Sequence, residues 1–177
     1  IKLIEERLSN LVHFDTLTKL NNKYYFMKTL ETMLANAKRS GHKVAVVSLD
    51  VDHFKQINDT HGHFAGDEFL QRVGHLFSSV TRSMDVIARL GGDEFGVIIN
   101  NVDENTPLES IAGRYLSVLE KPLKIEGEEI LPSVSVGVAI YPDDGQDVES
   151  LLKRSDKAMY YIKKTGKKNI AFYKDSL

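Results

Sequence analysis

Residues 87–99, IARLGGDEFGVII, decide how the fold of this chain is interpreted. Two apolar runs typical of β-strands flank Gly-Gly-Asp-Glu, and this order predicts a β-hairpin. The paired glycines supply the positive φ angles that a tight turn needs, and they let another molecule approach the backbone closely. Two adjacent carboxylates, Asp93 and Glu94, follow. Taken alone, such a segment is more often a surface turn that ends in solvated acids.

A second acidic segment, residues 44–52 (VAVVSLDVD), changes that interpretation. Its apolar run predicts a strand buried on both faces at the centre of a sheet. Asp50 and Asp52 end the run and point the same way, because strand side chains repeat every two residues. If the hairpin pairs beside this strand, Asp50 faces Asp93, and each raises the pKa of the other. A hard divalent cation such as Mg²⁺ would keep both ionised, which suits phosphoryl or nucleotidyl transfer.

The letters GGDEF, from Gly91 to Phe95, are the signature of a known family. From about Asp15 to Ile170 the chain resembles the GGDEF-domain diguanylate cyclases, which condense two GTP into cyclic di-GMP and release pyrophosphate. The resemblance therefore implies a Mg²⁺-dependent nucleotidyltransferase, with Mn²⁺ as an alternative cofactor.

The resemblance also implies roles for individual residues. Asp50, the Val51 carbonyl and Asp93 would hold the metal ion, and Asp93 with Glu94 would help to deprotonate the 3′-hydroxyl of GTP. Three lysines would neutralise phosphate charge: Lys55, Lys163 and Lys167. Lys167 stands where the family commonly has arginine, so it keeps the charge without bidentate geometry. Lysines at a helix C-terminus are also favoured by the helix dipole alone, so this second interpretation stays open.

Asn58 and Asp67 carry the chemistry that a guanine edge requires. An amide carbonyl and a carboxylate accept hydrogen bonds from the ring N–H and the exocyclic amine, which adenine cannot offer in that way. The resemblance places base recognition on these two residues, within FKxxND and GHxxGD as they stand here. It adds Phe54 and His63, from the same two motifs, as further substrate-binding positions.

Two other patterns are set aside. His53, His61 and His63 include a His-x-His pair, but no third ligand at a recognisable spacing supports a zinc site. The letters GDEF occur a second time at 66–69, where the apolar residues follow helical spacing and predict a helix instead of a hairpin.

Arg82 and Asp85 lie just before the predicted hairpin. From the residues alone, an Arg and an Asp three positions apart are a local ion pair. Their distance from Gly91 matches the RxxD inhibitory site of the family, so the resemblance implies that they bind cyclic di-GMP as a feedback inhibitor. Arg114 is the nearby candidate for a second arginine, but its register is unsuitable.

Composition limits the remaining possibilities. The 177 residues are 42% hydrophobic and carry a net charge of −2, which fits one domain without general attraction to nucleic acid or to a membrane surface. No apolar run is long enough to span a membrane, and no signal peptide is visible. The absence of cysteine fits a reducing compartment, so we expect a cytoplasmic domain without direct membrane contact.

The first residues predict a separate element. Ile1, Ile4, Leu8 and Leu11 have the a/d spacing of a coiled coil, over less than two heptads. The helix either joins two protomers or packs on its own domain, and both interpretations stay open. We expect a linker helix over 1–13 and the GGDEF domain over 14–177. Because the chain starts at Ile1, we also expect an upstream sensory domain in a longer protein.

The order of predicted elements indicates an α+β fold with a ferredoxin-like βαββαβ core, similar to nucleotidyl cyclases and polymerase palms. A small hairpin over 123–130 and flanking helices add to this core. Thr106-Pro107-Leu108-Glu109 predicts a capping box that opens one of the helices.

Three functions follow from these observations. The first is a diguanylate cyclase that acts as a homodimer, because each domain presents one GTP and two must meet. The second is a catalytically inactive GGDEF module that senses GTP or cyclic di-GMP. The third is a different nucleotide cyclase or a polymerase palm, against which Asn58 and Asp67 predict a preference for guanine.

Overall fold

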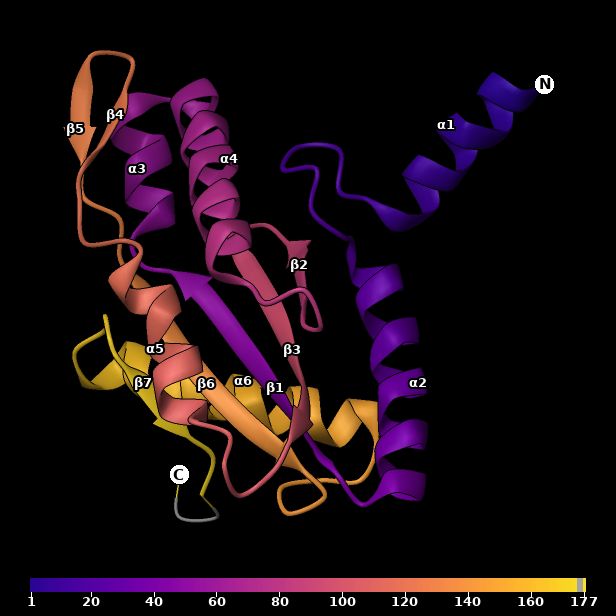
Figure 1. Ribbon diagram of the computed structural model, residues 1–177. Helices are drawn as coiled ribbons and strands as arrows, with labels where there is room; N and C mark the ends of the chain where they lie inside the picture. Colours follow the sequence, from indigo (N-terminus) through magenta and orange to yellow (C-terminus); the bar gives the residue numbers. More distant parts are fainter. Residues whose placement is uncertain (175–176) are drawn as a thin grey trace.

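A five-stranded sheet forms the centre of the computed structural model, which describes residues 1–174 and 177 (Figure 1). Its strands are β1 (Lys43–Val51), β2 (Val86–Gly91), β3 (Glu94–Val102), β6 (Val134–Tyr141) and β7 (Ile170–Phe172). Their spatial order is β2-β3-β1-β6-β7. β1 is antiparallel to both β3 and β6, and only the β6–β7 pair of this sheet is parallel. A separate hairpin consists of β4 (Leu123–Ile125) and β5 (Glu128–Ile130).

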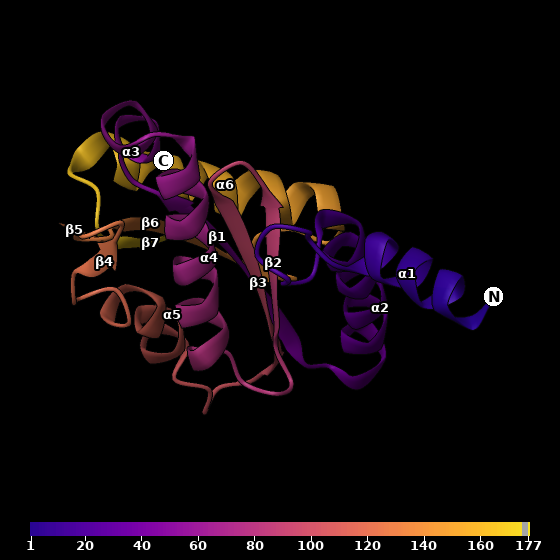
Figure 2. The same ribbon diagram turned by 90° about the horizontal axis from the view of Figure 1, so that it is seen from above.

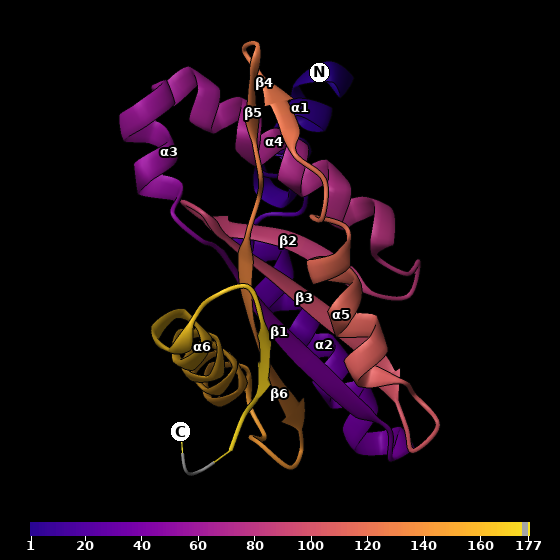
Figure 3. The ribbon, with the colours of Figure 1, turned by 90° about the vertical axis from the view of Figure 1, so that its left-hand side faces the viewer.

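Helices cover both faces of the sheet, whereas the N-terminal helix α1 contributes to neither core. The helices are α1 (Lys2–His13), α2 (Lys23–Ser40), α3 (Phe54–His61), α4 (His63–Val80), α5 (Leu108–Ser117) and α6 (Val148–Thr165). One apolar core lies between the sheet and α4 with α5, and a second lies between the sheet and α2 with the start of α6. Figure 3 shows α6 on one side of the strands and α4 and α5 on the other.

The central strand β1 belongs to both cores because it is apolar on both faces. Ala45, Val47 and Leu49 contribute to the core beneath α4 and α5, whereas Val44 and Val46 contribute to the core beneath α2. All five are fully buried, and burial of each valine or leucine contributes about 1.5–3 kcal/mol. A strand with this support provides a rigid base for the acids at its end.

The predicted ferredoxin-like core is confirmed. In chain order it consists of β1, the α3–α4 pair, β2, β3, α5 and β6, with the predicted small hairpin β4–β5 inserted before β6. The second GDEF segment lies in α4, as its spacing predicted. α6 and the edge strand β7 follow the core, and β7 was not among the predicted strands.

The predicted capping box is wrong. α5 begins at Leu108, and no side chain caps its N-terminus. The Thr106 hydroxyl instead donates to the Asp103 carboxylate and accepts from the Asp103 amide. The local loop therefore occupies the side chain that would have capped the helix.

The N-terminal helix α1 extends away from the sheet (Figures 1 and 2). None of its residues is buried, and Ile4, Leu8 and Leu11 are all more than half exposed. The apolar a/d residues of this helix therefore do not pack on the domain, and the C-terminal end of α1 contacts α2, through His13 and Tyr25. The division of the chain at residue 13 stays a prediction. No helix in the described part of the chain is both long and apolar enough to cross a membrane.

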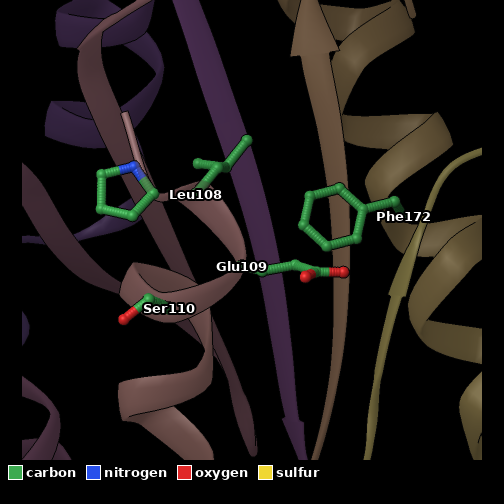
Figure 4. A pocket seen from close by; sticks show the side chains of 5 residues that line it. Leu108, Glu109, Ser110 and Phe172 are labelled. Carbon is green, nitrogen blue, oxygen red and sulfur yellow. The ribbon is translucent and has the colours of Figure 1, made fainter. Parts of the chain in front are cut away.

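A surface pocket of about 510 Å³ lies between the start of α5 and β7 (Figure 4). Its lining residues are Pro107, Leu108, Glu109, Ser110 and Phe172. Glu109 is its one ionisable group, and none of the predicted site residues reaches it. The predicted metal- and substrate-binding residues lie instead around the acidic end of β1.

Candidate active site

The GGDEF turn connects β2 to β3 at the end of β1. Gly91 and Gly92 have φ angles of 139° and 52°, which side chains rarely adopt, so the glycines permit this turn. β3 pairs with β1 so that Asp50 lies opposite Glu94, and the Val51 amide donates to the Asp93 carbonyl oxygen over 3.1 Å. The structure therefore brings the two predicted acidic segments together, as strand pairing predicted.

Asp50 is a buried carboxylate with too few donors. Its Oδ1 has no hydrogen-bond partner in the structure. Burial is the largest cause that raises the pKa of Asp50 to about 7, and the charge of Asp93 is the second. The Lys163 ammonium acts in the opposite direction. Two carboxyl groups that share one site cannot both stay ionised without a compensating cation. This pair is costly to the folded protein and is characteristic of a functional site.

The donor set at this position suits a hard cation. Asp50, Asp93 and the Val51 carbonyl provide oxygen atoms only. Lys163 Nζ already lies 3.2 Å from Asp50 Oδ2 and donates to the Val51 oxygen over 3.3 Å, which shows that a positive charge is favourable there. In the described chain no group of three or more His, Cys, Asp or Glu side chains could hold a metal ion. Two carboxylates fit Mg²⁺, which completes its shell with water and substrate phosphates.

Glu94 points to the face of the sheet that α6 covers. Burial raises the pKa of Glu94, and the charges of Asp156 and Asp93 raise it further. Burial also raises the pKa of Asp156, and both acids line a pocket of about 270 Å³ together with Lys23 and Lys153. Asp156 was not among the predicted site residues. Its position seven residues before Lys163, on the same face of a helix, was the available signal.

Asp52, two residues after Asp50, is fully satisfied. Burial alone would raise the pKa of Asp52, but hydrogen bonds from Ser133, Ser135 and the Lys168 amide, together with Lys163, hold it below its ordinary value. The same ammonium lies 3.4 Å from Asp52 Oδ1, so the two acids do point the same way. Their environments nevertheless give them opposite pKa shifts.

The residues predicted to read guanine lie on two adjacent helices. Phe54 and Asn58 lie on α3. His63 and Asp67 lie in the first two turns of α4, which follows α3 after Gly62. A Cβ added to Gly66 would lie 1.8 Å from Asn58 Oδ1, so the absence of a side chain leaves the space that Asn58 occupies. The two helices pack against each other, and two residues separate β1 from α3, so the residues predicted to bind guanine lie on helices next to the end of β1.

The three predicted phosphate lysines are placed differently. Lys163 contacts the acids directly. Lys55 is exposed on α3, and Lys167 follows α6 in a left-handed conformation with φ of 61°. Within the described residues neither of these two forms an ion pair, so both side chains can reach a ligand.

An ion pair that the sequence did not reveal holds the GGDEF turn. Arg89 donates from Nε to the Gly92 oxygen over 2.9 Å and from Nη1 to Asp15 Oδ1 over 3.1 Å. Asp15 also accepts from the amide and the hydroxyl of Thr18. The segment that follows α1 is thereby connected to the turn that carries Asp93.

The predicted inhibitory pair forms a bidentate contact. Arg82 Nε and Nη2 donate to the two carboxylate oxygens of Asp85 over 2.6 and 3.0 Å, and the Asn100 amide donates to Asp85 Oδ1. The Asp85 side chain is 1% exposed and that of Arg82 is 27% exposed. This geometry is the local ion pair that the residues alone predict, and only the arginine presents surface to a ligand.

Comparisons with known proteins agree with this geometry. A family model described as diguanylate cyclase, GGDEF domain, matches residues 12–169. Diguanylate cyclase DosC from Escherichia coli K12 is 39% identical over 178 residues, which cover 99% of this chain and 38% of DosC. Cyclic di-GMP phosphodiesterase NbdA from Pseudomonas aeruginosa is 35% identical over 96% of this chain and 22% of NbdA. The chain thus spans less than half the length of either relative.

A solved structure shows the same fold. The coiled coil and GGDEF domain of DgcB from Caulobacter crescentus, in complex with c-di-GMP, superposes with a TM-score of 0.85 at 26% identity. The match covers 97% of this chain and 91% of the chain in that structure. With the GGDEF turn beside the acids of β1 and a family match over most of its length, this chain belongs to the GGDEF domain family.

Proposed function

We propose that the chain is a magnesium-dependent diguanylate cyclase that converts two GTP into cyclic di-GMP and two pyrophosphates. The observation that carries the proposal is the unsatisfied, buried Asp50 carboxylate beside Asp93, at the turn that two glycines keep open. The family match and the DosC relative support the same reaction.

Each GTP would bind across the end of β1. Asn58 and Asp67 would accept hydrogen bonds from the guanine edge, with Phe54 and His63 beside them. The phosphates would bind to lysines on three segments: Lys55, Lys163 and Lys167. Asp50, the Val51 carbonyl and Asp93 would hold Mg²⁺, which neutralises charge on the phosphates when it is bound.

Asp93 would take the proton of the 3′-hydroxyl as that oxygen attacks the α-phosphorus of the opposite GTP. The bond from the α-phosphorus to the bridging oxygen breaks, and pyrophosphate leaves with the electron pair. Glu94 lies next to Asp93, and burial together with the charges of Asp156 and Asp93 raises its pKa, which makes it a stronger base than an ordinary glutamate. Two such steps close the ring.

One domain offers one nucleotide site, so we propose that the active form is a homodimer in which two sites face each other. The exposed apolar face of α1 supports such a pairing through a coiled coil, and in the DgcB structure a coiled coil accompanies the GGDEF domain. A sensory domain before α1 would control the pairing. We place the GGDEF domain itself in the cytoplasm, where GTP is present and where reducing conditions suit a chain without cysteine.

Arg82 and Asp85 would form the product-binding site that limits synthesis. Binding would require Arg82 to exchange part of its contact with Asp85 for a phosphate or a guanine of cyclic di-GMP. The c-di-GMP-bound structure of DgcB supports product binding by this kind of domain.

The test is to incubate the purified chain with GTP and Mg²⁺ and to separate the products by chromatography. The same assay is run with ATP, without metal, and with dimerisation enforced by a coiled coil fused before Ile1. The proposal predicts that cyclic di-GMP forms from GTP in the presence of the metal. It predicts no cyclic product from ATP and none without the metal. Binding of GTP without any product, even in the enforced dimer, would indicate a sensing module instead. Turnover of ATP at an equal rate would refute guanine recognition by Asn58 and Asp67.

A further inference from the structure

Asp52 is a buried carboxylate at which four parts of the chain meet. Its side chain is fully inaccessible to solvent. Oδ2 accepts from the Ser133 hydroxyl over 2.6 Å and from the Lys168 amide over 3.2 Å, and Oδ1 accepts from the Ser135 hydroxyl over 2.7 Å. The Asp52 amide also donates to the Ser133 carbonyl oxygen over 2.8 Å. A carboxylate with this many donors is fixed in position and ionised.

One group that Asp52 fixes is the ammonium of Lys163. Nζ lies 3.4 Å from Asp52 Oδ1, 3.2 Å from Asp50 Oδ2 and 3.3 Å from the Val51 oxygen. A lysine side chain has four rotatable bonds, and three acceptors on one side restrict where its charge can lie. Of the two carboxylates among these acceptors, Asp52 is held by hydrogen bonds from Ser133, Ser135 and the Lys168 amide, whereas Asp50 Oδ1 has no hydrogen-bond partner.

The second group is the turn between α6 and β7 (Figure 3). Lys167 and Lys168 are consecutive non-glycine residues with positive φ angles, 61° and 46°. Each left-handed residue of this kind costs roughly 1–2 kcal/mol and persists only where contacts hold it. The Lys168 amide is held by Asp52, and the Lys167 amide donates to the Ile162 oxygen over 2.9 Å. The direction in which Lys167 leaves the turn therefore depends on Asp52.

We propose that Asp52 is a positioning residue for the polyphosphate of the nucleotide. It sets Lys163 and, through the Lys168 amide, the turn that presents Lys167, and it does not touch the substrate. This inference rests on the proposed function, in which both lysines bind phosphate. Among the described residues, the hydrogen bonds and the ion pair of the Asp52 side chain lead to the start of β6, to α6 and to the α6–β7 turn. We therefore expect Asp52 to affect binding of the phosphates more than binding of the guanine.

The sign of the effect distinguishes this role from a simple charge effect. An anion near the phosphates repels them, so removal of its charge alone would strengthen GTP binding. A positioning role predicts the opposite result, because lysines that lose their orientation bind the phosphates less well. The variant Asp52→Asn keeps the shape of the side chain, loses the charge, and replaces one acceptor oxygen by an NH₂ group.

The experiment measures binding without turnover, by calorimetric titration of the wild-type chain and of Asp52→Asn with Mg²⁺–GTP and with guanosine. We expect the affinity for Mg²⁺–GTP to fall at least about tenfold and the affinity for guanosine to change less than about twofold. The control Asp143→Asn, an exposed acid paired with Lys43 at the far end of β1, should change neither. Ser133→Ala removes one donor to Asp52 and keeps the charge, so it should weaken Mg²⁺–GTP binding by a smaller factor.

Unchanged or tighter binding of Mg²⁺–GTP by Asp52→Asn would overturn the positioning role. An equal loss for GTP and guanosine in both Asp52→Asn and Ser133→Ala would also overturn it, because that result indicates a general loss of structure. A wild-type chain that binds GTP but forms no cyclic di-GMP, even in the enforced dimer, would refute the cyclase proposal alone. A wild-type chain that binds neither ligand would refute both.

Discussion

Two ionisable pairs lie at opposite ends of the β2–β3 hairpin, and the fold treats them in opposite ways. Asp50 and Asp93 are two acids, of which Asp50 forms an ion pair with Lys163, and one oxygen of Asp50 has no hydrogen-bond partner. Arg82 and Asp85 are a base and an acid in bidentate contact, and the Asn100 backbone amide donates a further hydrogen bond to the Asp85 carboxylate. In the first pair, burial and the charge of Asp93 raise the pKa of Asp50. In the second pair, the opposite charges of Arg82 and Asp85 compensate each other.

The difference separates function from stability. A pair that satisfies itself contributes to the fold and can bind a ligand only by exchange of contacts. A pair that the fold leaves unsatisfied costs stability and is ready for a cation. We therefore expect opposite results when each pair is disrupted, and the four predictions below run from the largest expected effect to the smallest.

Asp93→Ala should lower the rate of cyclic di-GMP formation at least about 10³-fold, because it removes the group that we propose as a metal ligand and as the acceptor of the 3′-hydroxyl proton. Steady-state assays with GTP and Mg²⁺ measure this, and circular dichroism checks that the fold is intact. Asp143→Asn is the matched control at a distance from the site. Product formation at the wild-type rate in Asp93→Ala would refute the assignment of the site.

Arg82→Ala should destabilise the fold by about 3 kcal/mol, because it leaves the carboxylate of Asp85 buried with one amide donor. Urea unfolding at pH 7 measures the change. Lys43→Ala removes the exposed pair between Lys43 and Asp143 and should change the free energy of unfolding by less than about 0.5 kcal/mol. If both variants lose equal stability, the contrast between the two pairs has no basis.

Asp50→Asn should have the opposite sign and stabilise the metal-free protein by about 2 kcal/mol at pH 8. The pKa of Asp50 is raised from 3.8 to about 7, so the folded state binds this proton more tightly than the unfolded state does. Wild-type stability that depends on Asp50 is full below pH 3.8 and is lost as the pH rises through 7. The advantage of the variant should therefore disappear at pH 4, and a gain independent of pH would contradict this cause.

Gly66→Ala should weaken guanosine binding about tenfold, because its Cβ would occupy the place of Asn58 Oδ1. Fluorescence or calorimetric titration with guanosine measures it. Gly113→Ala is the control, since a Cβ there meets no atom within 4 Å in a helix that favours alanine. Equal affinities for guanosine in both variants would place base recognition elsewhere.

The part of the site that the sequence predicted depends on local rules. Alternation along a strand put Asp50 and Asp52 on one side, and the paired glycines of the hairpin put Asp93 at its turn. The apolar run of β1 then placed both segments in the same sheet. These rules act over a few residues, so they can be applied without knowledge of the whole fold.

The missed contacts join distant segments. Ser133 and Ser135 satisfy Asp52 from more than 80 residues away, and Asp15 meets Arg89 across 74 positions. Such pairs exist because β6 lies beside β1 and because the segment after α1 passes the turn, which no local pattern encodes. The edge strand β7 was missed for a related reason: three residues after a lysine-rich turn give too short a pattern.

The most direct test of the account is the pKa of the Asp50 carboxyl, measured by ¹³C NMR with Asp50→Asn to assign the signal. In metal-free protein we predict a value of about 7. With Mg²⁺ and a non-hydrolysable GTP analogue, the pKa should fall below its ordinary value, because a cation then compensates both acids. An ordinary pKa in the metal-free protein, or a raised one that Mg²⁺ and nucleotide leave unchanged, would contradict the proposed site.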